Sequence, residues 1–273
     1  MIDGIIDTNL AFRAMSAFVA LWACLSGLEQ LSSAGTLEDD GLLSWRVFKL
    51  YFQNNTGSRF VEPFVEPTGF KAVLVTRIVF GVLLAGAAAL DALHPALFGV
   101  LFLTDVVILY RILVGLSGAY HMVMVMNIGL FLGTLFPEGS VVRVAAILFM
   151  AVQGILAYAI AGYLKLISSD WRSGTGLQGV FATYTFGENR VYDLLTSYPN
   201  VSLFASWSVI IFECLYPLVL VVDPSTTTLF FGTAIVFHLM NGLLMGLNGF
   251  ILIFPASYFP VYLTNLYVHQ WFL

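Results

Sequence analysis

Long apolar stretches alternate with shorter polar ones along most of this chain. About 20 consecutive apolar residues are needed for a helix to cross the hydrocarbon core of a bilayer. Such a helix satisfies its own backbone hydrogen bonds, which lipid cannot do for it. The pattern predicts seven spans, over residues 11–31, 72–92, 94–113, 119–136, 142–166, 201–222 and 228–252.

The last segment, 253–273, has a different pattern, because tyrosines and other rings recur through it together with two prolines. Amphipathic rings prefer the headgroup zone of a membrane, so we expect an interfacial or half-embedded segment here. The predicted fold class is therefore an all-α integral membrane protein. It comprises a bundle of about seven transmembrane helices and this C-terminal segment, in one transmembrane domain over 1–273.

Composition and charge agree with this prediction. Of 273 residues, 59% are hydrophobic and 10% are charged, whereas an ordinary soluble domain has roughly 25% charged residues. The net charge of −5 includes no basic stripe of the kind that nucleic acid binds, so membrane lipid is the expected partner and nucleic acid is not. Cys24 and Cys214 lie in apolar runs, so we expect neither a disulfide nor a metal site.

Two polar segments, 32–71 and 168–200, are expected to lie outside the bilayer. Lys and Arg residues near the span ends are more numerous on the side that follows the first, third and fifth spans. The positive-inside rule would place that side in the cytoplasm. Because these loops are long, the rule is weakened here. The expected location is an integral, multi-pass position in the cytoplasmic membrane if the source is bacterial.

Several ionisable side chains fall inside or at the ends of the predicted spans. Each costs about 2.5–3.5 kcal/mol on insertion scales, so it should face the bundle interior or a wet cavity. They therefore mark candidate functional positions. The set is Arg77, Asp105, Arg111, His121, Lys165, Glu213 and His238.

Lys165 ends the fifth span, one helical turn after Gly162, and a small residue at that place would let a neighbouring helix approach closely. Two interpretations are open. The ammonium group can bend to the interface, as lysines near helix ends commonly do. Held among apolar walls instead, it would become a neutral amine that acts as a general base near neutral pH.

Two histidines are the other candidates for chemistry. His238 lies in the middle of the seventh span, and Asn241 and Asn248 share its helical face, which predicts a polar stripe. A hydrogen bond between helices would also explain this stripe. His121 begins the fourth span at the membrane face where Lys165 ends the fifth, although a histidine at a helix end is often an ordinary interfacial residue.

The remaining charges are expected to serve packing. Arg77 and Glu213 both lie well inside their spans, and we expect them to neutralise each other as a structural ion pair. Asp105 and Arg111 are six residues apart and do not share a helical face, so they are poor partners for one another.

Three segments, 120–131, 161–171 and 237–250, resemble in order the membrane domain of vitamin K-dependent gamma-carboxylases and their bacterial relatives, the HTTM proteins. The first contains His121. The second contains Tyr163, Lys165 and Trp171, and the third begins Phe237-His238 and continues through Asn241. The resemblance covers roughly residues 70–265, and the lysine–tryptophan and histidine–asparagine motifs are its most specific parts.

The resemblance implies a lyase-like membrane enzyme. Such an enzyme couples oxygenation of a reduced quinone, a vitamin K-type hydroquinone, to removal of a proton from a peptide glutamate, after which carbon dioxide adds. On this mapping Lys165 deprotonates the hydroquinone and His121 supports carboxylation. His238 and Asn241 line the quinone cavity, and Tyr163 and Trp171 complete the cofactor-binding set, with no metal. A water-poor pocket would protect the strong base that such a reaction forms.

The chain departs from the family pattern in two ways. One additional residue separates the lysine from Asp170-Trp171, and we expect no counterpart of the large extramembrane domain of the animal enzymes. A peptide or small-protein substrate would then bind the polar loops or arrive with a partner protein. The resemblance also implies that Lys165 and His121 face the extracytoplasmic side, against the count of basic residues, and we follow the resemblance.

Two alternatives need no carboxylation. Bacterial members of the same family resemble sporulation-delaying protein B, which implies a role in the maturation or export of a secreted peptide. The other alternative is a non-catalytic bundle that acts as an assembly partner or immunity protein, with polar residues that serve packing only.

Overall fold

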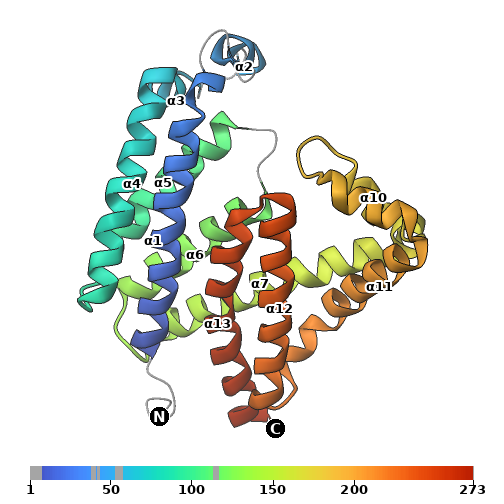
Figure 1. The fold of residues 1–273 in the computed structure, drawn as a ribbon. Coiled ribbons are helices and arrows are strands. Elements are labelled where there is room, and N and C mark those ends of the chain that lie inside the picture. The colour runs from blue at the N-terminus through green and yellow to red at the C-terminus, as the bar shows by residue number, and fades with distance from the viewer. Residues whose placement is uncertain (1–7, 38–40, 42–43, 53–57, 113–116, 273) are drawn as a thin grey trace. The chain divides into compact units, whose positions relative to one another are not determined.

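The structure is a computed structural model that describes residues 8–37, 41, 44–52, 58–112 and 117–272. These residues form helices and connecting turns, with no strand among them. They pack as two compact units, Met1–Ala146 and Ile147–Leu273. Helix α7, Val141–Ile167, begins in the first unit and continues into the second (Figure 1). The predicted all-α class is confirmed.

The first unit is built on α1, α4, α5 and α6. Helix α4 packs along α1, and α5 packs against both α4 and α6. Pro67 and Pro95 each occupy the first turn of their helix, where the missing N–H has no intrahelical partner to lose. The helices are α1 Thr8–Ser32, η1 Ala34–Leu37, α2 Trp45–Phe52, α3 Ser58–Val65, α4 Pro67–Ala89, α5 Pro95–Arg111 and α6 Gly118–Leu135.

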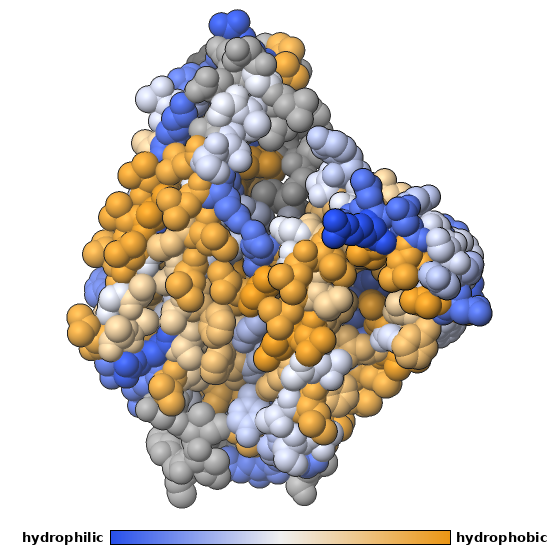
Figure 2. All heavy atoms as spheres, in the orientation of Figure 1, coloured by the Kyte–Doolittle hydropathy of each residue, from blue (hydrophilic) through white to orange (hydrophobic). Residues whose placement is uncertain are grey.

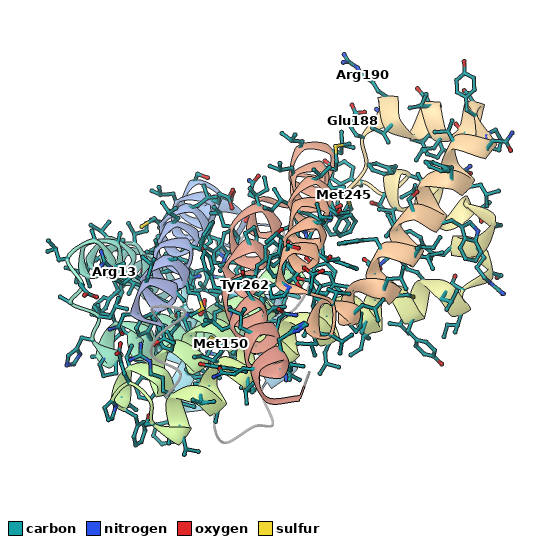
Figure 3. The ribbon with its side chains drawn as sticks, turned by 90° about the horizontal axis from the view of Figure 1, so that it is seen from below. Arg13, Met150, Glu188, Arg190, Met245 and Tyr262 are labelled. Atoms are coloured by element: carbon teal, nitrogen blue, oxygen red, sulfur yellow. The ribbon has the colours of Figure 1, made fainter. Side chains whose placement is uncertain are left out.

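The second unit combines the greater part of α7 with three further long helices and three short ones. The short helices lie in the polar segment after α7, and Figure 3 shows Glu188 and Arg190 at the start of the last of them, α10. The helices after α7 are α8 Ser169–Ser173, α9 Thr175–Phe181, α10 Asn189–Ser197, α11 Pro199–Leu215, η2 Tyr216–Leu220, α12 Pro224–Met245 and α13 Asn248–Phe272.

The described residues contain seven helices that are long and apolar enough to cross a membrane. They are α1, α4, α6, α7, α11 with η2, α12 and α13. Their outward faces carry large apolar side chains, for example Val75, Val79, Val82 and Leu83 on α4, which are 48–60% exposed. Figure 2 shows such residues along the long helices and hydrophilic residues over the α8–α10 segment. The chain is an integral, multi-pass membrane protein.

The composition of this set differs in two places from the predicted spans. Helix α5 has 17 residues, which is at the lower end of the length that crosses a bilayer. Of the segment predicted to be interfacial or half-embedded, residues 253–272 belong instead to the continuous helix α13, which has a candidate span over Asn248–Gln270. Pro255 and Pro260 lie inside this helix without ending it.

Gly246 separates α12 from α13 and makes the predicted boundary of the seventh span, 228–252, wrong. Its φ of +69° is a left-handed conformation that glycine adopts without steric cost. The N–H of Gly246 bonds the Gly242 carbonyl at 3.0 Å, and that of Leu247 bonds the Asn241 carbonyl at 3.4 Å. This is a common way to end a helix, and the apolar residues on both sides hide it in a hydropathy pattern.

The turn η2, which follows α11, is held by side chains of α13. The side-chain amide of Asn265 donates to the carbonyls of Val219 and Val222, both at 2.8 Å. Nε2 of His269 donates to the Val222 carbonyl, also at 2.8 Å. Carbonyls at a helix end need partners from outside the helix, and here α13 supplies them.

Candidate functional site

The candidate site lies in the second unit, where Lys165 of α7 meets Glu213 of α11. The amine nitrogen Nζ donates to both carboxylate oxygens of Glu213, to Oε1 at 3.0 Å and to Oε2 at 2.7 Å. The exposed fraction is 19% for the Lys165 side chain and 4% for that of Glu213. A buried carboxylate therefore holds the amine, which favours the interior interpretation of Lys165 over snorkelling.

Gly162 allows α11 to approach α7 closely enough for the contact between Lys165 and Glu213. A Cβ atom at residue 162 would lie 2.7 Å from the backbone nitrogen of Cys214 and 2.8 Å from the carbonyl carbon of Glu213. The backbone of α11 thus passes against α7 one turn before the lysine, as small residues at helix interfaces permit. The close approach predicted from Gly162 is confirmed.

Trp171 of α8 covers the amine from another direction. Nζ of Lys165 lies 5.1 Å from the centroid of the Trp171 ring, within the range of a cation–π contact. The turn that brings the ring there is capped by the hydroxyl of Ser168, which accepts the Trp171 backbone N–H at 3.4 Å. Tyr163, by contrast, is 59% exposed and lies on the outer surface of α7.

Tyr158, two helical turns before Lys165 on the same face of α7, is the centre of a second polar group. Its hydroxyl lies 2.6 Å from Nε2 of His238 and 3.1 Å from the hydroxyl of Tyr258. The Tyr158 ring stacks on that of Tyr216 at a centroid distance of 3.8 Å. The imidazole of His238 stacks on the ring of Phe254 at 4.4 Å.

This aromatic group contains two buried polar atoms that have no hydrogen-bond partner among the described residues: Nδ1 of His238 and the hydroxyl of Tyr216. His238 is 2% exposed and Tyr216 is fully buried. If Nε2 of His238 accepts the Tyr158 hydroxyl proton, Nδ1 carries the ring proton and can donate to a bound molecule. The sequence pattern identified His238 but gave no sign of Tyr158 as its partner.

Of the two asparagines expected to share the helical face of His238, only Asn241 lies on the same helix. Asn241 lies one turn after His238 on α12 and is half-buried. Asn248 is the first residue of α13, beyond the break at Gly246. The predicted stripe through Asn248 is therefore wrong, because residues 238 and 248 do not share one helix.

His121 lies in the first turn of α6 in the first unit, and its side chain is exposed. Lys165 and His238 both belong to the second unit. The structure thus brings the lysine and His238 into one unit. The expectation that His121 shares a cavity with them stays a prediction.

The first unit contains its own buried ion pair. Nη1 of Arg77 donates to Oδ1 of Asp105 at 2.5 Å and to the Thr104 hydroxyl at 3.1 Å. Nε of Arg77 donates to the Ser26 hydroxyl at 2.9 Å, and the amide of Asn127 donates to Oδ2 of Asp105 at 2.7 Å. The exposed fractions of the Arg77 and Asp105 side chains are 0% and 1%.

The predicted ion pair between Arg77 and Glu213 is therefore wrong. Each residue has another partner, Asp105 for Arg77 and Lys165 for Glu213. Each of these four helices carries an ionisable residue inside its span, so the sequence alone offers no basis for deciding which ones are neighbours.

Comparison with protein-family models, with curated proteins and with solved structures finds no match. The resemblance to the carboxylase family accordingly stays a prediction. Within the described residues, no three His, Cys, Asp or Glu side chains are grouped to hold a metal ion. The candidate site rests on the geometry of Lys165, Glu213 and Trp171.

Proposed function

We propose that this chain is a membrane enzyme in which Lys165 acts as a general base toward a reduced, lipid-soluble quinone. The final target in this proposal is the side chain of a peptide glutamate. One observation carries the proposal: Lys165 is held in the interior by two hydrogen bonds from its amine to Glu213, yet keeps 19% of its side chain exposed. A molecule that approaches the pair reaches the lysine before it reaches Glu213, which is 4% exposed.

The residues around Lys165 fit a flat ring that carries oxygen atoms. The amine has three N–H donors: two bond Glu213, and the third makes a long bond of 3.5 Å to the Ala161 carbonyl, which the oxygen of a bound molecule can replace. The Trp171 indole offers a face for stacking beside the amine. When bound, a reduced quinone supplies an acidic hydroxyl and reacts with dioxygen. Such an apolar co-substrate would partition to this site from the bilayer.

The chain's own contribution is to place a base where bulk water is scarce. A general base must lie within hydrogen-bond reach of the proton that it removes, and its strength is preserved when water is excluded. Helices α7 and α11 provide this setting at Lys165. The unpaired Nδ1 of His238 adds a donor for a second oxygen in the same unit, with Asn241 one turn away.

The decisive experiment measures hydroquinone oxidation by the purified protein in lipid nanodiscs. Lys165→Ala should lower the rate by roughly 10²-fold or more, the usual contribution of a general base. Lys165→Arg should lose activity equally, because a guanidinium keeps the positive charge beside Glu213 but does not deprotonate. Lys71→Arg, the same change in the first unit, should leave the rate unchanged. Wild-type rates in Lys165→Ala would refute the base role.

Mass spectrometry of incubated peptides separates this function from the second candidate. A gain of carbon dioxide on glutamate supports a carboxylase, whereas cleavage or cross-linking supports a maturation factor like sporulation-delaying protein B. The non-catalytic alternative is favoured by one observation: the Tyr158 hydroxyl bonds both His238 and Tyr258, as it would if these residues served packing alone. It forecasts that Lys165→Arg retains full biological function.

A further inference from the structure

Glu213 stands directly behind Lys165, and no sequence motif assigns it a role. Its carboxylate accepts two hydrogen bonds from the amine, and its side chain is almost fully enclosed. The backbone from Glu213 to Cys214 passes closely against α7 at Gly162. The carboxylate is therefore held in place for one partner, the lysine amine.

We propose that Glu213 shares the proton of Lys165 and takes up that proton, so that the neutral amine of Lys165 can remove a proton from its substrate. At rest the pair holds one ionisable proton between the two groups. Moving it from Nζ to Oε2 along the 2.7 Å hydrogen bond gives a neutral amine and a carboxylic acid, with no other bond formed or broken. The amine then takes the substrate proton, so the pair holds two protons and the substrate becomes an anion beside an ammonium.

This proton transfer explains how a lysine that is held in an ion pair can still act as a base. An ammonium group has donors but no lone pair, so a lysine locked as an ion pair cannot act as a base. Taking both charges out of water removes the hydration that favours the charged form, which brings the uncharged form into reach. The pair, rather than the lysine alone, is then the base. The inference rests on the proposed function for the identity of the substrate only.

Few other titratable groups face the pair. Tyr158 on α7 and Cys214 on α11 interact electrostatically with Glu213, and both are ordinarily uncharged at neutral pH. On α8, which carries Trp171, Asp170 and Arg172 are exposed. The proton balance of the site is thus set by two groups, one on α7 and one on α11.

The first test is the dependence of hydroquinone oxidation on pH in Glu213→Gln. The wild-type pair of Lys165 and Glu213 acts as a base as long as it holds one ionisable proton. It stops acting as a base when a second proton from solvent binds to the pair at low pH. A lysine without the carboxylate works only at pH values where it is itself neutral. The acidic limb of the rate–pH profile should therefore move to higher pH by about one unit or more. Loss of rate by the same factor at every pH would show a merely structural role and overturn the proposal.

The second test needs no enzymatic activity. A small, membrane-permeable acylating reagent modifies only neutral amines, and mass spectrometry gives the modified fraction of Lys165 as a function of pH. In Glu213→Gln this labelling curve should move to lower pH, opposite to the rate profile, because the carboxylate no longer holds the amine protonated. Lys71 serves as the internal reference in the same sample. An unchanged Lys165 curve would overturn the proposal.

Control variants keep the two tests separable from folding. Glu138→Gln makes the same change at a half-exposed carboxylate of the first unit and should move neither curve. If Glu213→Gln does not fold, Glu213→Asp replaces it. Its shorter side chain should move the rate–pH profile to higher pH and the Lys165 labelling curve to lower pH, both by less than Glu213→Gln would. A wild-type protein that oxidises no hydroquinone counts against the proposed function, whereas an unchanged labelling curve would overturn proton sharing by itself.

Discussion

Two buried ion pairs, one in each unit, solve the same electrostatic problem in different ways. The Arg77–Asp105 pair is closed to solvent, and side chains from α1, α5 and α6 add three hydrogen bonds to it, while Nη2 of Arg77 has no partner among the described residues. The Lys165–Glu213 pair has one enclosed member and one partly exposed member, covered by the ring of Trp171. The first pair connects four helices, whereas the second connects α7 with α11.

The difference separates a packing role from a chemical one. A guanidinium stays protonated under all physiological conditions, so Arg77 cannot give its proton to Asp105. Lysine can lose its proton when it is desolvated, and it offers a single donor atom that a substrate can approach. Burial of charge is therefore no sign of catalysis by itself. What indicates a chemical role is a buried cation that can lose its proton and that remains partly exposed to an approaching molecule.

The largest effect on stability is expected from breaking the closed pair. Asp105→Ala leaves the guanidinium of Arg77 buried without a counter-charge, which should lower the free energy of unfolding by about 3–5 kcal/mol. Denaturant titration of the detergent-solubilised protein measures it. The double variant Arg77→Met/Asp105→Leu should recover most of the loss, because two apolar side chains need no partner. A single variant as stable as the wild type would contradict the packing role.

An intermediate effect is expected from separating the two helices at the open pair. Gly162→Ala places a methyl group 2.7–2.8 Å from backbone atoms of α11, and relief of this overlap should cost about 1–3 kcal/mol. Because α11 must move away, Lys165 should also become acylated at lower pH. Gly86→Ala is the matched control, since nothing lies within 4 Å of the added atom. Equal stability and equal labelling in the two variants would show that the close approach is not needed.

The smallest effect on stability is expected at Asp223, which precedes α12. Its carboxylate is exposed to water, in contrast to those of the two buried ion pairs. Hydrogen bonds from Ser225 and Thr226 lower its pKa from 3.8 to about 2. A lowered pKa means that its stabilisation is present above pH 4 and is lost as the pH falls toward 2. Asp223→Ala should lower the melting temperature slightly at pH 7, and this difference should shrink at pH 2.5. Asp223→Asn, which keeps an acceptor for the cap, should be nearer the wild type at pH 7.

The sequence predicts the membrane class and most spans because a long apolar run has few other stable environments. It also predicts the contact at Gly162, because only a small residue permits such an approach. It does not predict the partner of Arg77. Asp105 and Glu213 are both acids in apolar helices, and only the packing of α4 against α5 decides between them.

The boundary between α12 and α13 shows the same limit at the level of the backbone. The residues before and after Gly246 are similarly apolar, so hydropathy averaged along the sequence does not reveal the break between the two helices. The break depends on one positive φ and two backbone hydrogen bonds. The position of Asn248 relative to His238 follows from this break, and so does the extent of the candidate site on α12.

The bonds from Asn265 and His269 to η2 have a consequence for how this protein is made. The carbonyls that they satisfy were synthesised 43 to 47 residues earlier. Until α13 has been synthesised, those carbonyls lack these partners. The second unit should thus mature only after α13 has been inserted.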